Sequence, residues 1–472
     1  MITVCKKMKN PRLIISALRG GAGKTVLSVG IIAAWTKSGK TVTPFKKGPD
    51  YIDAGWLALA ADRPCYNLDT FLAESSEITK SFLSRTADSD IALIEGNRGL
   101  YDGIDTEGTT STAELAKLLK SPVILCIDCT KSTRTMAAAV LGCMRFDPDV
   151  RIRGVILNRI AGARHENVLR KNIELHCGIP VLGAIPKLHR QIFPERHMGL
   201  VPTPEHEWAK EAIDAAADMA AQYLDLDALA RTAADVPELP DLKKDRKQSV
   251  TSFSVPPKIG ILKDAAFQFY YPENIEALVS AGADPVFLSP LDPGEEKHLK
   301  HLDALYIGGG FPETHSRELA ENVAFRVELK LLAENGFPVY AECGGLMYLG
   351  EELVLEGKSY PMTGVFPLIF GLSKRPQGHG YTVVKVDEKN PFFEIGTEIR
   401  GHEFHYSKVL SWRGKDTDMV FSMKRGAGLI NDRDGVCYKK VLATYTHIHA
   451  LGMPSWAEAV VRNAAAYQQS KK

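Results

Sequence analysis

A cysteine followed by two glycines stands where a chain commonly holds a nucleophile. Residues 338–350 read PVYAECGGLMYLG, in which a short apolar run leads to Cys343 and an apolar helical stretch follows the glycines. A strand, a sharp turn and a helix make up a nucleophile elbow, here with cysteine in the role that serine has elsewhere. Because a helix N-terminus lowers the pKa of a thiol, we expect Cys343 to be partly thiolate at neutral pH. The motif predicts covalent catalysis by cysteine.

Such a thiol needs a base, and two histidines near the C-terminus are candidates. The strand expected at Ala443–Thr446 leads to His447, and His449 follows two residues later. A lone histidine is usually a surface or core residue. Here one follows a strand in the same half of the chain as the cysteine elbow, so we favour His447 as the base. His449 ranks second because its side chain would point the opposite way if the strand continued.

A glycine-rich loop in the same half could stabilise the negative charge that such a reaction develops. Residues 307–313 read IGGGFPE and follow a strand expected at Ala304–Ile307. The backbone N–H groups of this loop could form an oxyanion hole, in which one donor is commonly worth about 3 kcal/mol.

A second glycine-rich loop, near the N-terminus, has the composition of a phosphate-binding loop. Residues 13–25 read LIISALRGGAGKT, and a helical pattern follows at Val26–Trp35, with Gly39 as its expected stop. Glycines let backbone N–H groups converge on phosphate oxygens, and the helix N-terminus adds a positive dipole. The expected nucleotide contacts are Gly20, Gly21 and Gly23.

Lys24 and Thr25 follow these glycines, at the positions where such a loop carries its charged and metal-binding groups. Lys24 would reach the β- and γ-phosphates of ATP, and the Thr25 hydroxyl would hold Mg²⁺. Leu18 stands where the standard pattern has glycine, so the loop resembles the deviant form of the partition ATPases and dethiobiotin synthetases, with Arg19 in place of their usual lysine. The alternative is a glycine turn without a ligand, which the strand before and the helix after disfavour.

Four carboxylates follow strands that should end on the same side as this loop. Glu95 ends the run IALIE, Asp50 and Asp53 lie in KKGPDYID, and Asp128 ends a further strand. Mg²⁺ keeps several waters and takes only one or two carboxylates, so not all four are ligands. We take Glu95 as the metal ligand, Asp50 and Asp53 as residues of the nucleotide site, and Asp128 as a structural acid.

The elements around these motifs alternate between β-strand and helix in both halves, which predicts an α/β fold with parallel sheets. The first half has expected strands at Leu13–Ala17, Thr41–Phe45, Ile91–Glu95, Val123–Asp128, Gly154–Asn158 and Val181–Ile185. The second half has them at Lys258–Leu262, Pro285–Leu288, Ala304–Ile307, Val339–Ala341 and Ala443–Thr446. A stretch rich in proline, serine and charge separates the halves. We therefore divide the chain into a P-loop domain at 1–234, a linker at 235–257 and a second α/β domain at 258–472.

The composition excludes several classes of protein. The chain has 472 residues, with 58 Lys and Arg against 57 Asp and Glu, so its charge calls for neither nucleic acid nor a membrane surface. No apolar run approaches the length of a membrane span or signal peptide, so we expect a cytoplasmic protein. The eight cysteines are scattered, as reduced thiols would be, and we interpret the C-x-x-C pair Cys126 and Cys129 as core thiols and not as a zinc site.

These motifs together carry a resemblance that covers nearly the whole chain. They are RGGAGKT (19–25), KKGPDYIDAGW (46–56), EGNRGLYDG (95–103), LNRI (157–160), PERHMGL (194–200), IGGGFPE (307–313), AECGGLMYL (341–349), GHEFHYS (401–407) and YTHIH (445–449). The chain resembles the cobalamin-pathway glutamine amidotransferases, and among them the cobyrinic acid a,c-diamide synthases. The resemblance implies a P-loop ATPase domain followed by a class I glutamine amidotransferase-like α/β domain.

The resemblance also implies residue roles and a reaction. Cys343 would release ammonia from glutamine with His447 as its base. The synthetase site would use Lys24, Thr25 and Glu95 for Mg-ATP, and Asp50 and Asp53 for metal or substrate. ATP would activate the c and then the a side-chain carboxylate of cobyrinic acid as an acyl phosphate, which ammonia would convert to the amide. In class I triads an acid stands two residues after the histidine, but His449 stands there, so either a Cys–His pair suffices or the orienting group comes from elsewhere.

Other readings stay open on the sequence. The same chemistry could act on hydrogenobyrinic acid or a nickel sirohydrochlorin, and cobyric acid synthase or a partition-type ATPase switch rank lower. The segments expected to contact the macrocycle are Arg196–Leu200, Arg375–Tyr381 and Gly401–Ser407. The sequence does not fix the oligomeric state, a homodimer included.

Overall fold

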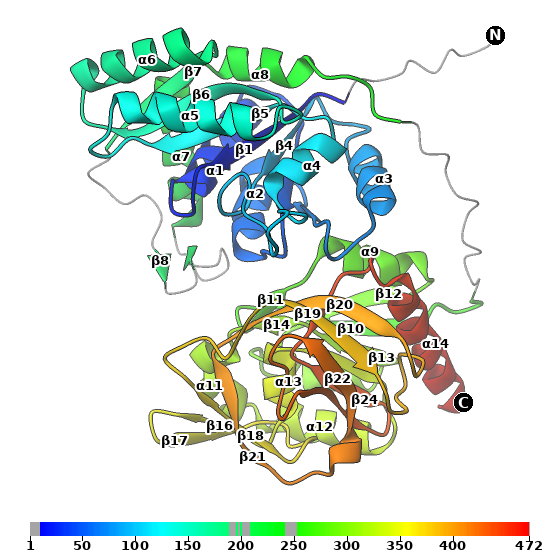
Figure 1. Cartoon of the computed structure of the whole chain (residues 1–472). Coiled ribbons are helices and arrows are strands. Elements are labelled where there is room, and N and C mark those ends of the chain that lie inside the picture. Colours follow the sequence, from blue (N-terminus) through cyan, green and yellow to red (C-terminus); the bar gives the residue numbers. More distant parts are fainter. Residues whose placement is uncertain (1–9, 188–194, 197–198, 201–207, 241–252, 472) are drawn as a thin grey trace, which may run out of the picture. The chain divides into compact units, whose positions relative to one another are not determined.

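A computed structural model describes residues 10–187, 195–196, 199–200, 208–240 and 253–471. The chain forms two compact units, Met1–Lys243 (unit 1) and Lys244–Lys472 (unit 2) (Figure 1). The division falls inside the segment 235–257 that the composition marks as a linker. The first residues of that segment are nevertheless fixed on unit 1, because Val236 is buried and the Pro237 carbonyl accepts a hydrogen bond of 2.7 Å from Arg12.

A seven-stranded parallel sheet forms the centre of unit 1, in the order β3-β2-β4-β1-β5-β6-β7. Its strands are β1 (Arg12–Ala17), β2 (Val42–Lys47), β3 (Tyr66–Leu68), β4 (Ile91–Glu95), β5 (Val123–Asp128), β6 (Ile152–Ile160) and β7 (Val181–Pro186). Every residue of β1 and β4 is buried, as expected of a parallel sheet with helices on both faces. The short strands β8 (Glu195–Arg196) and β9 (Gly199–Leu200) pair separately.

Eight helices in the described part of unit 1 surround this sheet. They are α1 (Lys24–Lys37), α2 (Ile52–Ala61), α3 (Ser75–Arg85), α4 (Thr112–Leu118), α5 (Arg134–Phe146), α6 (Ala163–Cys177), α7 (Ala209–Tyr223) and α8 (Leu226–Ala234). Helix α1 packs against α2 and α7, and α5 packs against α6. The phosphate-loop motif joins β1, the central strand, to α1, so the loop lies at the carboxyl edge of the sheet, where such folds bind ligands.

Unit 2 is built on a mixed sheet of ten strands in the order β12-β10-β13-β15-β24-β23-β22-β19-β20-β25. Its first five members run parallel, and the remaining five pair antiparallel. These strands are β10 (Lys258–Leu262), β12 (Asp284–Leu288), β13 (Ala304–Ile307), β15 (Val339–Glu342), β19 (Gly378–Val386), β20 (Glu398–His405), β22 (Met419–Arg425), β23 (Arg433–Tyr438), β24 (Val441–Thr444) and β25 (His447–Ile448). The α/β class is confirmed, and the antiparallel half was not predicted.

Smaller elements complete unit 2. Strand β11 (Phe267–Phe269) pairs with β14 (Gly309–Gly310), and a four-stranded sheet joins β16 (Glu352–Leu355), β17 (Lys358–Pro361), β18 (Leu368–Leu372) and β21 (Ser407–Trp412). The helices are α9 (Pro272–Ser280), α10 (Glu296–Leu299), α11 (Ser316–Glu321), α12 (Val323–Glu334), α13 (Gly344–Leu349) and α14 (Pro454–Ser470). Across the described residues of both units, the helices lack the combination of length and apolarity that a membrane crossing requires.

The strand expected at Ala443–Thr446 is displaced in the structure, and this correction matters for the candidate base. Strand β24 ends at Thr444, and His447 lies in β25, which pairs antiparallel with β20. The predicted strand was two residues too long because the sequence does not show which group accepts hydrogen bonds from the backbone N–H groups of Tyr445 and Thr446. That group is the buried carboxylate of Asp434.

Candidate active sites

Cys343 lies at the sharp turn between β15 and α13. Its backbone has φ 47° and ψ −99°, a left-handed conformation that a side-chain-bearing residue rarely adopts. The turn is held from both sides: the Cys343 N–H donates to the Thr444 carbonyl at 2.7 Å, and the Gly345 N–H donates to the Gly308 carbonyl at 3.2 Å. A strained backbone that persists in this way is a signal of function. The predicted elbow is therefore present in geometry as well as in sequence.

The thiol of Cys343 is not activated by its surroundings in the way the sequence suggested. Burial, together with the nearby carboxylates of Glu313 and Glu342, raises the pKa of Cys343 above its ordinary value. Helix α13 has only six residues, and its N-terminus does not offset burial. The expectation of a free thiolate at neutral pH is therefore wrong for the enzyme without substrate, and a base must remove the proton as the sulfur attacks.

The glycine loop at 307–313 contacts both the elbow and the candidate base. A Cβ atom added to Gly309 would come within 2.5 Å of His447 Cε1, and one added to Gly344 would lie 3.0 Å from the Gly310 nitrogen. Glycine is therefore required at these two positions because larger residues would push the three segments apart. The loop therefore contacts His447 on one side and the Cys343 elbow on the other, although the two residues are far apart in sequence.

Only part of this loop has N–H groups to offer a substrate. The Gly308 N–H already donates to the Tyr270 hydroxyl at 2.7 Å, and Gly309 and Gly310 pair with β11. The N–H groups of this loop that could form an oxyanion hole therefore do not include that of Gly308.

His447 is buried, and its Nδ1 lies 3.3 Å from Glu342 Oε2. Its ring stacks on that of His402, with centroids 4.8 Å apart and planes 19° apart. His449 contacts a different set of residues: its Nε2 lies 3.7 Å from Glu273 Oε1, and its ring centroid lies 4.6 Å from that of Tyr271. His449 thus has a different carboxylate partner, and the histidine beside the glycine loop is His447.

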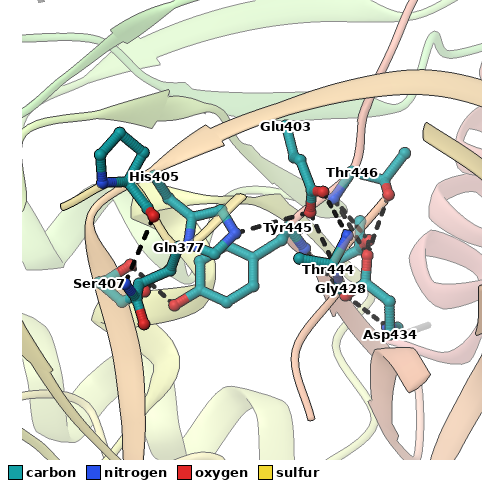
Figure 2. A network of polar contacts seen from close by, with 12 residues as sticks. Gln377, Glu403, His405, Ser407, Gly428, Asp434, Thr444, Tyr445 and Thr446 are labelled. Carbon is teal, nitrogen blue, oxygen red and sulfur yellow. Dashed lines mark hydrogen bonds and ion pairs between the residues drawn. The ribbon is translucent and has the colours of Figure 1, made fainter. Parts of the chain in front are cut away.

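The buried carboxylate of Asp434 fixes residues 444–446, the segment that leads from the end of β24 to His447. Figure 2 shows its oxygens facing Thr444, Tyr445 and Thr446. Oδ2 accepts from both threonine hydroxyls, at 2.6 and 3.0 Å, and from the Thr446 N–H at 3.1 Å. Oδ1 accepts from the Tyr445 N–H at 3.0 Å. These bonds turn the chain out of β24, so they set the separation of the elbow from the histidine.

In unit 1 the phosphate-loop glycines have the conformation that the motif demands. Gly21 and Gly23 have φ 71° and 91°. A Cβ added to Gly20 or Gly21 would meet nothing within 4 Å, so this part of the loop is open. The other end of the loop is pinned, because Asn158 Nδ2 donates to the Ala22 carbonyl at 2.8 Å. The loop therefore has an open stretch of backbone followed by a fixed entry into α1.

Thr25 and Glu95 lie together below this loop. The Thr25 hydroxyl donates to Glu95 Oε1 at 2.8 Å, whereas Glu95 Oε2 is buried and has no hydrogen-bond partner among the described residues. A buried carboxylate oxygen without a partner costs free energy unless a cation or donor joins it. Mg²⁺ prefers such oxygen ligands and completes its shell with water and phosphate, so the pair fits this metal. Lys24, the residue directly before Thr25, donates from its Nζ to the Arg98 carbonyl at 2.7 Å.

Lys46 is a residue of this site that the sequence did not single out. Its Nζ lies 2.6 Å from Asp53 Oδ2 and 2.9 Å from Glu95 Oε1. Burial opposes its charge, but Asp53 and Glu95 together raise the pKa of Lys46 well above its ordinary value. A permanently cationic lysine therefore links two of the predicted acids. Lys46 begins the motif KKGPDYIDAGW, but a lysine pair at the end of an apolar strand is ambiguous and gave it no separate role.

The comparisons with known proteins agree with both halves of this description. Residues 13–200 match the CobQ/CobB/MinD/ParA nucleotide binding domain, and residues 258–454 match the CobB/CobQ-like glutamine amidotransferase domain. Proteins named cobyrinate a,c-diamide synthase are 42% identical in Magnetococcus marinus (96% of this chain, 97% of the relative), 39% in Archaeoglobus fulgidus (97% and 98%) and 38% in Listeria innocua (94% and 97%). The chain belongs to the cobyrinate a,c-diamide synthase family. It is accordingly an enzyme, a glutamine-hydrolysing ligase with a nucleotide-binding domain.

Two of the four predicted acids bond to nearby residues in the structure, and the place of Asp50 in the nucleotide site stays a prediction. Asp128 accepts hydrogen bonds from Thr130 and pairs with Arg19 at 3.2 Å and Arg159 at 2.8 Å, in line with its interpretation as a structural acid. Asp50 Oδ1 accepts from the Asp53 N–H at 2.9 Å, at the start of α2. Asp50 therefore orders the turn that carries Asp53 toward Lys46.

The C-x-x-C pair is buried, as interpreted from the sequence. Cys126 Sγ lies 3.3 Å from the Ala22 carbonyl, and burial raises the pKa of both Cys126 and Cys129 to about 12. Within the described residues, no group of three or more His, Cys, Asp or Glu side chains is arranged to hold a metal ion.

One expected substrate-binding segment is contradicted by burial. In the stretch Gly401–Ser407, the side chains of His402, Glu403, His405 and Ser407 are buried, and Figure 2 shows three of them within a network inside unit 2. His405 stacks on Tyr445 with centroids 3.6 Å apart. The prediction that this stretch contacts the macrocycle is therefore wrong for these side chains. Arg375 is exposed, so the segment Arg375–Tyr381 stays a prediction, and the side chains of Arg196–Leu200 lie outside the described residues.

A pH-dependent stability is expected from Asp50. Burial, and then the neighbouring Asp53, raise the pKa of Asp50 to about 7, against about 3.9 in an unfolded chain. The folded protein therefore holds a proton between pH 4 and 7 that the unfolded chain releases. The stability that this proton contributes is complete below the unfolded pKa and disappears as pH rises through 7, with a slope of up to about 1.4 kcal/mol per pH unit.

The variant Asp50→Asn should remove that slope while its amide oxygen keeps the bond to the Asp53 N–H. We expect its unfolding midpoint, measured by calorimetry without ligands, to equal that of the wild type near pH 4 and to exceed it increasingly up to pH 8. Asp128→Asn is the control, because the pKa of Asp128 is about 2 and this group does not titrate in the window. Equal midpoint differences at all pH values for Asp50→Asn would contradict the assignment.

Proposed function

We propose that this enzyme uses ATP and glutamine to amidate the a and c side-chain carboxylates of cobyrinic acid. The observation that carries the proposal is the strained Cys343 elbow, which shares a glycine loop with His447, in a chain whose other unit holds an open phosphate loop. Relatives named cobyrinate a,c-diamide synthase align over almost the whole chain, and this supports the choice of substrate. A partition-type switch would leave the cysteine elbow without a use.

The first half-reaction activates the carboxylate in unit 1. The loop N–H groups around Gly20 and Gly21 and the Lys24 ammonium hold the phosphates of ATP, with the γ-phosphoryl group facing the substrate carboxylate. A carboxylate oxygen attacks that phosphorus, ADP leaves, and an acyl phosphate forms. Thr25 and Glu95 would hold Mg²⁺, which supplies charge neutralisation to the polyphosphate when bound. Lys46 pairs with Glu95 and Asp53 and holds both carboxylates in place.

The second half-reaction produces ammonia in unit 2. His447 takes the proton of Cys343 as the sulfur attacks the side-chain amide of glutamine, because the raised pKa of the thiol disfavours a preformed thiolate. His447 then gives the proton to the amide nitrogen, which departs as ammonia. The thioester that remains on Cys343 is hydrolysed by water, and glutamate is released. Ammonia attacks the acyl phosphate, and phosphate leaves as the amide forms. Two such cycles give the a,c-diamide.

The test is to incubate the enzyme with cobyrinic acid, Mg-ATP and glutamine labelled with nitrogen-15 in its amide. We expect two labelled amides, assigned to the c and a side chains by mass spectrometry and NMR. Conversion of hydrogenobyrinic acid or a nickel sirohydrochlorin, with cobyrinic acid unchanged, would overturn the choice of substrate and keep the chemistry. Absence of any glutamine hydrolysis with ATP and each of these substrates present would overturn the roles of Cys343 and His447.

A further inference from the structure

Glu342 is a fully buried carboxylate at the end of β15, directly before the candidate nucleophile. Its Oε2 lies 3.3 Å from His447 Nδ1 and accepts a bond from the Tyr306 hydroxyl, also at 3.3 Å. Its Oε1 accepts from the Ile448 N–H at 3.2 Å. Both carboxylate oxygens are thus directed at the segment that carries the histidine. A carboxylate that is buried in this way needs hydrogen-bond partners, and these contacts supply them.

We propose that Glu342 is the positioning residue of His447, so that the orienting acid of this active site is the residue that immediately precedes the cysteine. The inference rests on the proposed roles of Cys343 and His447. A histidine that donates its Nδ1 proton to a carboxylate presents the lone pair of Nε2, the tautomer that a general base needs. The position two residues after the histidine, where class I enzymes carry this acid, is taken here by His449.

One edge of the His447 ring is directed at the glycine loop. Its Cε1 and Nε2 atoms are those that a Cβ on Gly309 would approach, to 2.5 and 3.3 Å, whereas Nδ1 is on the side of Glu342. The Nε2 edge therefore faces the glycine loop, which in turn packs on the elbow at Gly344. A carboxylate that holds Nδ1 therefore leaves Nε2 directed at the glycine loop that packs on the Cys343 elbow.

The electrostatic setting also suits this role. Among the described residues, no lysine or arginine lies within ion-pair distance of Glu342, and its one ion-pair partner is His447. The imidazolium that forms when His447 accepts the thiol proton is then stabilised by a buried carboxylate at close range. Asn274 reinforces the contact, because its Nδ2 donates to the Tyr306 hydroxyl at 3.3 Å and to the Ile448 carbonyl at 3.0 Å.

The chain contains a matched comparison for this contact. Glu273 and His449 form a second buried glutamate–histidine pair in unit 2, at 3.7 Å, beside Tyr271. If burial of a glutamate beside a histidine were only structural, changing either glutamate should have similar effects. If Glu342 orients the base, only its replacement should affect glutamine hydrolysis.

The experiment compares Glu342→Gln with Glu273→Gln in the full chain. We expect Glu342→Gln to lower kcat for glutamine hydrolysis by about 10²- to 10⁴-fold with little change in KM. Amidation supplied with free ammonia should stay within about threefold of the wild type, because it needs neither Cys343 nor His447. Glu273→Gln should leave both rates within about threefold. The remaining activity of Glu342→Gln should show a shifted acid limb in its pH profile, because the carboxylate no longer stabilises the imidazolium.

Two further variants test the proposal even if Glu342→Gln does not fold. Glu342→Asp should restore part of the lost kcat, and Tyr306→Phe, which removes one bond to Glu342, should lower kcat for glutamine hydrolysis without affecting ammonia-dependent amidation. The proposal is overturned if Glu342→Gln hydrolyses glutamine like the wild type, or if Tyr306→Phe loses both reactions equally. Absence of glutamine hydrolysis in the wild type would instead refute the proposed function.

Discussion

Cys343→Ala is expected to lower glutamine-dependent amidation by at least about 10³-fold and to leave ammonia-dependent amidation near the wild-type rate. In the proposed mechanism the sulfur forms the thioester, so no neighbouring group can replace it. The proposed reaction in unit 1 makes no use of this thiol, so we expect the acyl phosphate still to form and to react with ammonia from solution. Measuring both rates on one preparation separates the two half-reactions.

A matched cysteine controls for the loss of a thiol in unit 2. Cys437 lies in β23, is half-buried and has no proposed part in the reaction. Cys437→Ala should keep both rates within about threefold of the wild type. Glutamine hydrolysis by Cys343→Ala at the wild-type rate would exclude this cysteine as the nucleophile. Equal loss of both reactions would instead indicate that the substitution damages the fold.

Both chemical motifs could be read from the sequence because each is local. The residues from Gly20 to Thr25 and from Glu342 to Gly345 bend the chain by themselves, with positive φ at Gly21, Gly23 and Cys343. A short run of sequence is then enough to predict strand, turn and helix. The partners of these motifs are a different matter, because they come from strands that are distant in sequence.

The contacts that complete each site could not be predicted for that reason. Lys46 meets Glu95 only because β2 and β4 are neighbours in the sheet, and Glu342 meets His447 only because β15 lies beside β24. A pattern along the chain gives the type of each strand but not its neighbour. The displacement of His447 into β25 has the same origin, since Asp434 acts from ten to twelve residues away.

Burial was the second property that sequence could not supply. The stretch Gly401–Ser407 alternates polar and aromatic residues, which is typical of a surface that binds a charged ring system. The structure instead turns His402, Glu403 and His405 inward. The same property reversed the expected effect on Cys343, whose pKa is raised by burial and not lowered by the short helix. Proximity to a helix N-terminus is therefore insufficient evidence of an activated thiol.

Lys24→Ala should affect the reaction in the complementary way. We expect amidation with either glutamine or free ammonia to fall by about 10²- to 10³-fold, because the cation that offsets the charge on the transferred phosphoryl group is lost. In the structure the Lys24 ammonium is buried and bonded to the Arg98 carbonyl, so little solvent is available to take over its role. Glutamine hydrolysis measured without ATP should remain, since its residues lie in unit 2. The rates are obtained from ADP release, product mass and glutamate formation.

Lys37→Ala is the matched control for that variant. Lys37 lies at the other end of the same helix, is partly exposed and pairs with Asp214 at 2.8 Å, a surface ion pair of the kind that contributes little to stability. It should leave amidation from both nitrogen sources unchanged. Wild-type amidation by Lys24→Ala would exclude the loop as the ATP site. Loss of the glutamine-dependent reaction alone would place Lys24 in the supply of ammonia, which is the role that we propose for unit 2.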